Sequence, residues 1–237
     1  MKRIFCIVFF LAVASCAILF IGCGGDAINP DDVRFSHEIG TNLVRVCYGL
    51  SDPREYGTRL LRSVVSLKDI AERNRKLSII FEVVSRVRFK GKTAAEREGA
   101  YFRLRDFTGA SAHVLRENGN DWRSILELWL AEVACLKDES DICIKEHMRL
   151  MNLAKNTKDH EMVEKLLFEA DEMLHCARYS ATFHEQNMSI IVLWDDSVAA
   201  KYCATLPWWK KMMVVRRIKN AIGRYPDWYL DEKKKGH

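Results

Sequence analysis

The spacing of apolar residues is the feature that most constrains what this chain can fold into. Apolar side chains recur every three or four positions between residues 60 and 87, and the same period returns through residues 125–174. This period lines them along one stripe of an α-helix, whereas a half-buried strand would alternate at every second residue. Only residues 189–194 favour a strand by composition, and they have no convincing partner strand, so we expect buried helix there.

Capping and turn signals divide the pattern into separate helices. An Asp-Pro pair starts the first over residues 53–88, with a candidate break near Asn74. A capping box of Thr93 and Glu96 starts the second. Further helices are expected at 121–136, 141–155, 161–179 and 207–223, with a polar loop at 137–140 and another capping box at 182–185.

The connections between these helices are short, which favours antiparallel neighbours. The chain has 4 Pro and 12 Gly, too few for the many tight turns of a β-sandwich. The sequence therefore predicts an all-α fold, an antiparallel helical bundle of about five to seven helices with no confident sheet. We expect the helical domain at 53–237, after a tether and irregular segment at 23–52.

The first 22 residues have the layout of a secretory signal peptide. Two cations precede an apolar run over residues 4–21, which ends in a small residue. Residues 20–23, Phe-Ile-Gly-Cys, resemble the lipobox of bacterial lipoproteins, although that family prefers Leu or Val where Phe stands. The resemblance implies cleavage before Cys23 and lipidation of its thiol. Cys16 is a second candidate, but processing there would leave a short apolar stub on the mature protein.

An uncleaved membrane anchor and plain secretion are the alternatives to lipidation. An apolar run of 18 residues lies at the threshold for a spanning helix. In all three cases the folded part lies outside the cytoplasm. The expected location is the cell envelope, lipid-anchored and facing the periplasm or the cell exterior, with single-pass anchoring as the alternative. The implied partner is the membrane, through acylated Cys23.

Residues 207–224 form the most specific surface that the sequence offers. They hold six cations and no acid. The candidate contact residues are Trp208, Trp209, Lys210, Lys211, Arg216 and Arg217. One interpretation is a membrane-surface helix, with tryptophans at the headgroup level and cations on anionic lipid. The other is a final bundle helix whose face at Val214, Val215 and Ile218 packs on the rest of the domain or on a protein partner.

Charge is distributed in blocks along the chain. Residues 54–105 are basic, 106–204 are acidic and 205–237 are basic again. Such blocks either lie near one another in the fold and neutralise, or attract a charged partner. A basic stretch with aromatic residues also occurs in nucleic-acid-binding proteins. No nucleic acid is expected as a partner outside the cytoplasm.

Five cysteines remain after the signal peptide and Cys23 are set aside. An odd number leaves at least one thiol unpaired. Cys135 and Cys143 flank the polar loop expected at 137–140, and a helical hairpin there would let them form a disulfide if their Cα atoms came within about 7 Å.

No motif identifies a reaction. Glu172 and His175 have the Glu-x-x-His spacing of di-iron bundles, but the second motif and the extra glutamates that such sites need are missing. His160 and Glu161 begin like a zincin helix, which then lacks its second histidine. We therefore assign no catalytic, metal or cofactor-binding residue.

Two hypotheses about function follow. The first is an exported, lipid-anchored envelope protein that acts as a non-enzymatic interaction or scaffold module. The alternative is a periplasmic ligand-binding or enzymatic bundle, with a pocket between helices near Trp129, Trp194 and His175. A large apolar cavity with a few converging polar groups would favour the second hypothesis.

Overall fold

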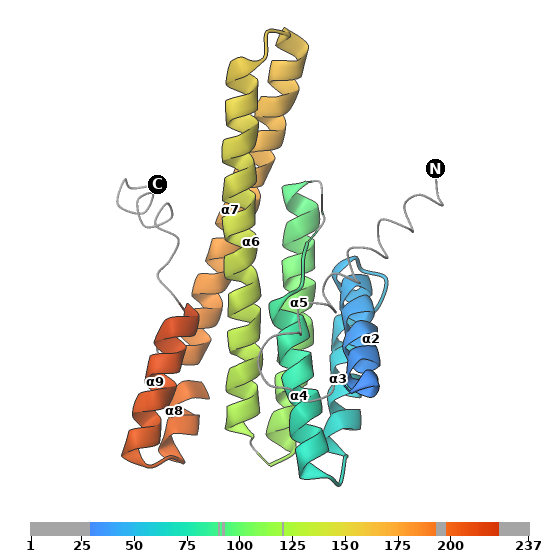
Figure 1. Ribbon diagram of the computed structural model, residues 1–237, viewed down its shortest axis with the longest axis vertical. Helices are drawn as coiled ribbons and strands as arrows, with labels where there is room; N and C mark the ends of the chain where they lie inside the picture. The colour runs from blue at the N-terminus through green and yellow to red at the C-terminus, as the bar shows by residue number, and fades with distance from the viewer. Residues whose placement is uncertain (1–28, 90, 92, 120, 193–197, 223–237) are drawn as a thin grey trace.

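The computed structural model describes residues 29–222, except 90, 92, 120 and 193–197. Over these residues the chain forms eight helices and no strand (Figure 1). The predicted all-α class is confirmed, with one helix more than the expected range. The signal peptide, the lipobox-like segment with Cys16 and Cys23, Trp194 and Arg224 all lie outside the described residues. The helices are α2 (Pro30–Cys47), α3 (Pro53–Val65), α4 (Ile70–Ser85), α5 (Ala94–Glu117), α6 (Trp122–Asn156), α7 (His160–Val192), α8 (Val198–Ala204) and α9 (Trp208–Ile222).

Helix α6 is the centre of the arrangement. It contacts α4 and α5 on one side and α8 and α9 on the other, and α7 runs antiparallel beside it. The far halves of α6 and α7 continue beyond the other helices as a two-helix projection (Figure 1). The buried apolar residues form two clusters accordingly. The larger fills the bundle, and the smaller lies between α6 and α7 in the projection.

Three predicted helix starts are confirmed by their caps. The Asp52 carboxylate accepts a hydrogen bond from the Glu55 N–H, 2.7 Å away. Thr93 and Glu96 form the expected capping box. The Asp121 carboxylate accepts from the Ser124 N–H at 3.1 Å and starts α6. Each cap satisfies backbone donors that the first helical turn leaves without a partner.

The segment expected to be a tether and irregular, residues 23–52, instead contains helix α2. The Asn29 side chain caps it, Pro30 occupies its first turn, and two acids follow. Ile39 and Leu43 lie one turn apart and are buried in the main cluster. The bundle therefore begins some twenty residues earlier than predicted. The apolar stripe was too short to be recognised beside the polar residues around it.

The polar loop predicted at 137–140 is wrong, because α6 runs through it without a break. Two of its four residues are buried and paired. Glu139 forms an ion pair with Arg97 of α5, and the Ser140 hydroxyl donates to the Ala177 carbonyl of α7 at 3.3 Å. Neighbouring helices thus satisfy these polar groups in place of solvent.

Two other predicted helix boundaries differ from those in the structure. The break in the first long helix lies at 66–69, where Asp69 caps α4, and not near Asn74. The capping box at 182–185 is wrong, since α7 continues to Val192. The Thr182 hydroxyl donates to the Arg178 carbonyl one turn earlier, a bond that a helix interior allows. The helix expected at 189–194 is present as far as Val192, and Ile191 within it is fully buried.

The basic and acidic blocks lie against one another. Five ion pairs join basic to acidic blocks: Arg54–Asp106, Arg62–Glu117, Arg88–Asp138, Arg97–Glu139 and Arg217–Glu127. This favours neutralisation within the fold as the role of the charge blocks. Arg97–Glu139 is buried. Each of the other four pairs has at least one exposed side chain, so each of these four contributes about 1 kcal/mol or less to stability.

Helix α3 packs closely on α5 at Gly57. A Cβ atom there would lie 2.8 Å from the Phe107 carbonyl oxygen and 2.9 Å from the Ser111 hydroxyl, both in α5. Next to it, the rings of Tyr56 and Phe107 stack with centroids 5.7 Å apart. Only glycine lets α3 approach α5 this closely.

Gly57→Ala is expected to lower the free energy of unfolding by about 1–3 kcal/mol, because the added methyl must push α3 away from α5. Gly109→Ala is the matched control. It is also helical, but its Cβ would meet nothing within 4 Å, and removing a helical glycine stabilises by up to about 1 kcal/mol. Urea denaturation of both variants measures the difference. Equal midpoints would contradict this account of Gly57.

Candidate functional site

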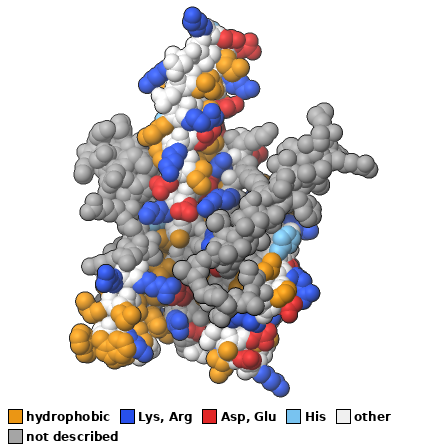
Figure 2. Space-filling view, viewed as in Figure 1, with side chains coloured by type: hydrophobic (Ala, Val, Ile, Leu, Met, Phe, Trp, Pro, Cys, Tyr) orange, Lys and Arg blue, Asp and Glu red, His pale blue; other side chains and the backbone are white. Residues whose placement is uncertain are grey.

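Helix α9 carries the six residues predicted as a contact surface, and it lies at the edge of the bundle. In the space-filling view, apolar side chains gather at the end of the molecule where α8 turns into α9, with cations beside them (Figure 2). The six residues do not form one surface. The helix turns Arg217 towards the bundle and the two tryptophans away from it.

The inner face of α9 attaches it to α6. Ile218 is buried in the main cluster, and Val214 is half-buried against it. The Arg217 guanidinium makes ion-pair contacts of 2.6 and 2.7 Å with the two carboxylate oxygens of Glu127 in α6. Burial raises the pKa of Glu127, and the charge of Arg217 opposes that rise. The interpretation of α9 as a packed bundle helix therefore holds for this face.

The outer face of α9 is apolar as well. Trp208, Met212 and Met213 have exposed fractions of 75, 63 and 66%, and Trp209 is half-exposed. The exposed cations Lys210 and Arg216 lie among them, and the Lys210 ammonium is 5.2 Å from the centre of the Trp209 ring. Single exposed apolar residues are ordinary, but four large ones on adjacent turns of one helix indicate a contact surface.

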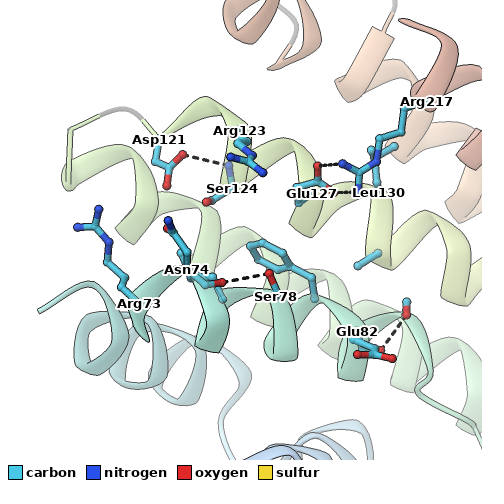
Figure 3. A pocket seen from close by; sticks show the side chains of 14 residues that line it. Arg73, Asn74, Ser78, Glu82, Asp121, Arg123, Ser124, Glu127, Leu130 and Arg217 are labelled. Atoms are coloured by element: carbon cyan, nitrogen blue, oxygen red, sulfur yellow. Dashed lines mark hydrogen bonds and ion pairs between the residues drawn. The ribbon is translucent and has the colours of Figure 1, made fainter. Parts of the chain in front are cut away.

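A cleft of about 680 Å³ lies between α4 and the first turns of α6, and Arg217 of α9 reaches into its wall. Figure 3 shows Asn74, Ser78 and Glu82 on one wall and Arg123 and Glu127 on the other. A smaller cavity of about 110 Å³ adjoins it, and Arg123, Glu127, Leu130 and Arg217 line both.

The acids of the cleft already have partners. Glu82 pairs with Arg86 at 2.6 Å, Asp121 caps α6 and Glu127 holds Arg217. The lining therefore mixes paired charged groups with apolar side chains such as Phe81 and Leu130, unlike the mainly apolar pocket that would favour the ligand-binding hypothesis. Trp129 and His175 were expected near such a pocket, but neither lines the cleft. Trp129 is buried in the core, and His175 is exposed on α7 beside Asp171, 3.5 Å away.

A buried carboxyl lies where α6 meets α7. Glu132 is 1% exposed, and one of its oxygens accepts a hydrogen bond from the Asn187 amide at 2.8 Å. The other oxygen has no hydrogen-bond partner among the described residues. Burial raises the pKa of Glu132 to about 7, against the opposing effect of the Asn187 hydrogen bond. A carboxyl with such a pKa changes charge near neutral pH.

The predicted disulfide between Cys135 and Cys143 is wrong. Both residues lie on the unbroken helix α6, eight positions apart, so their Cα atoms are about 12 Å from each other along the axis. A disulfide requires less than about 7 Å. The Cys135 thiol instead donates to the Val87 carbonyl, 3.4 Å away.

The Glu-x-x-His motif of α7 has a structural role that spacing did not indicate. The Glu172 carboxylate accepts a hydrogen bond of 2.6 Å from the Ala94 N–H at the start of α5. It thus caps a helix that lies 78 positions away in the sequence. The structure describes no group of three or more metal-ligating side chains in the part of the chain that it covers.

Comparison with family models, with curated proteins and with solved structures finds no match to this chain. Within the described ranges, no helix is both long and apolar enough to cross a bilayer. The α9 surface and the buried groups of α6 are the features of the described residues that bear on function.

Glu132→Gln tests the buried carboxyl. Folding raises its pKa from an ordinary 4.5 to about 7, so between these values the native state holds a proton that the unfolded chain has lost. The stabilisation is full below pH 4.5 and is lost as pH rises to about 7, by an amount on the order of 3 kcal/mol. Urea denaturation measures the free energy of unfolding at pH 5 and at pH 8. The difference between these two values should be smaller for Glu132→Gln than for the wild type. The exposed control Glu161→Gln should keep the wild-type difference.

Proposed function

We propose that this chain is an exported, lipid-anchored helical protein of the cell envelope, and that it acts as a non-enzymatic interaction module. In this proposal an acylated Cys23 and the outer face of α9 both contact an anionic membrane surface. The lipobox-like residues 20–23 support the anchor. One acyl chain binds a bilayer only marginally, so a second contact is needed for stable attachment.

The outer face of α9 is the observation that carries the proposal. Tryptophans favour the headgroup region of a bilayer, because one end of the indole is apolar and its N–H is polar. Lys210 and Arg216 add attraction to anionic lipid, worth about 1 kcal/mol for each cation near the surface. The whole of α9 lacks an acidic residue, so nothing on this helix opposes that attraction.

The inner face of α9 supports the same proposal. Ile218 and the Arg217–Glu127 ion pair hold the helix on α6. The outer face is therefore presented by a folded domain, and it does not have to order itself on binding. A preorganised surface loses less conformational entropy on association than a free peptide does.

The ligand-binding alternative draws on one observation, the cleft between α4 and α6. Its acids are already paired, and its walls carry charged residues from three helices. The cleft thus favours a small polar ligand at most. We regard it as the weaker basis for a function.

Trp208→Ser combined with Trp209→Ser is expected to weaken vesicle binding about tenfold or more, since the indoles supply most of the apolar contact. The chain from residue 24 is used, so that no acyl group contributes. Sedimentation with phosphatidylcholine vesicles, with and without phosphatidylglycerol, measures binding. Binding should require phosphatidylglycerol and fall as salt rises.

Phe168→Ser is the matched control for that experiment. Phe168 is 66% exposed on α7, in the projection, away from α9. The Phe168→Ser variant should bind vesicles as tightly as the wild type does. Unchanged binding by the tryptophan variant, with an unchanged melting temperature, would refute the membrane role of α9.

The anchor is tested separately, by intact mass of the membrane-extracted protein after expression in a bacterium. The expected mass is that of a chain beginning at Cys23 with added acyl groups. Cys23→Ser should abolish both cleavage and acylation, whereas Cys16→Ser should leave them unchanged. The mass of the uncleaved chain would show that residues 4–21 remain attached and that Cys23 is not processed.

A further inference from the structure

Helices α6 and α7 approach each other closely along a seam of small side chains. The Ser140 hydroxyl of α6 reaches the Ala177 carbonyl of α7, and the Ser180 hydroxyl of α7 reaches the Leu136 carbonyl of α6 at 2.5 Å. A serine side chain extends by only one carbon and one oxygen. The two helix backbones must therefore be nearly in contact at this level.

Cys143 and Cys176 face each other on this seam. Cys143 lies one turn beyond Ser140 on α6, and Cys176 precedes Ala177 on α7. Their exposed fractions are 1% and 0%, and both belong to the small core of the projection. Their thiols are free in the structure, and the register of the seam, in which Ser140 bonds to Ala177, places them at the same level of the two helices.

We propose that Cys143 and Cys176 are a disulfide-forming pair that cross-links α6 to α7 at the base of the projection. In the reaction, a thiolate from one cysteine attacks a sulfur of an external disulfide and displaces one thiolate from it. The second cysteine then attacks the mixed disulfide and displaces the other thiolate. The two cysteines lose two protons and two electrons in total, and the external disulfide accepts the electrons and is reduced to two thiols.

The surroundings of the folded pair do not give the two thiols separate roles. The Cys143 sulfur lies 3.5 Å from the Arg97 guanidinium and 3.5 Å from the Glu139 carboxylate, which form an ion pair, so the two charges beside it oppose each other. Because both thiols are buried in the folded chain, the exchange takes place before α6 and α7 close.

The position of the pair gives the cross-link a structural purpose. A small apolar cluster and the contact of the His147 ring with the Ala170 carbonyl hold the projection together, and few other helices cover it. Isolated pairs of helices are marginally stable, because tertiary packing supplies most helical stability. A covalent link at the base would keep the two helices in register.

The other cysteines are less suited to pairing. Cys47 and Cys135 lie near each other in the larger core, away from the projection, but the Cys135 thiol donates to the Val87 carbonyl at 3.4 Å. Cys203 on α8 is half-buried. Whether the link forms in the cell rests on the proposed export, since disulfides persist in oxidising compartments. The pairing itself does not depend on export.

The test uses the full chain, unfolded and reduced, and then refolded in a buffer of reduced and oxidised glutathione. Remaining thiols are alkylated, and peptides are mapped by mass spectrometry without reduction. The expected result is a single Cys143–Cys176 link, with Cys47, Cys135 and Cys203 alkylated. Adding dithiothreitol to the oxidised protein should lower its melting temperature by about 5–15 °C.

Two variants complete the experiment. Cys176→Ala should remove the link and the effect of dithiothreitol, while the control Cys135→Ala should retain both. Complete alkylation of the refolded wild type, or a link to a different cysteine, would overturn the proposal even if a variant failed to fold. A link that forms in glutathione buffer but is missing from protein purified from cells would support the pair and count against export.

Discussion

The close antiparallel contact of α6 with α7 is the constraint on which the rest of the structure depends. These are the two longest helices, and α6 contacts five of the other described helices. Because small side chains line their seam, serine hydroxyls can bond directly to carbonyls of the opposite helix. Larger residues at these positions would separate the helices and shift everything that packs on α6.

Buried carboxyls mark the junctions of α6 with its neighbours. Glu139 is held by Arg97 and by the Tyr101 hydroxyl, both from α5. Glu132 has only neutral hydrogen-bonding partners, and burial raises its pKa. The first carboxyl is compensated by a charge of opposite sign. Burying the second carboxyl costs more free energy, and this free energy depends on pH.

The regular features of the fold could be predicted from the sequence. The apolar period gave the all-α class, and the caps at Asp52, Thr93 and Asp121 depend only on residues next to them. The predictions that were wrong concern features that depend on residues far away in the sequence. Nothing near Glu139 indicates that an arginine 42 positions away neutralises it, so a buried polar turn of helix looked like a loop.

The same reason explains what was missed in α9. The sequence indicated one apolar face, through Val214 and Ile218. Packing on the bundle and contact with a membrane were therefore alternative roles for the same face. The structure shows that Trp208 and Met212 form a second apolar face, which the bundle leaves uncovered. Which of two faces a helix buries is decided by its neighbours, and the period of its own residues does not contain that information.

The length of α6 has a consequence for how far the molecule reaches. Its 35 residues extend about 50 Å from the first turn to the last. The α8–α9 corner lies at one end, and the turn at 157–159 lies at the other (Figure 1). If the outer face of α9 rests on a bilayer, α6 extends along the membrane surface, because it runs in nearly the same direction as α9 (Figure 1). The turn at 157–159 would then lie to one side of the attachment, at a distance set by the number of helical turns.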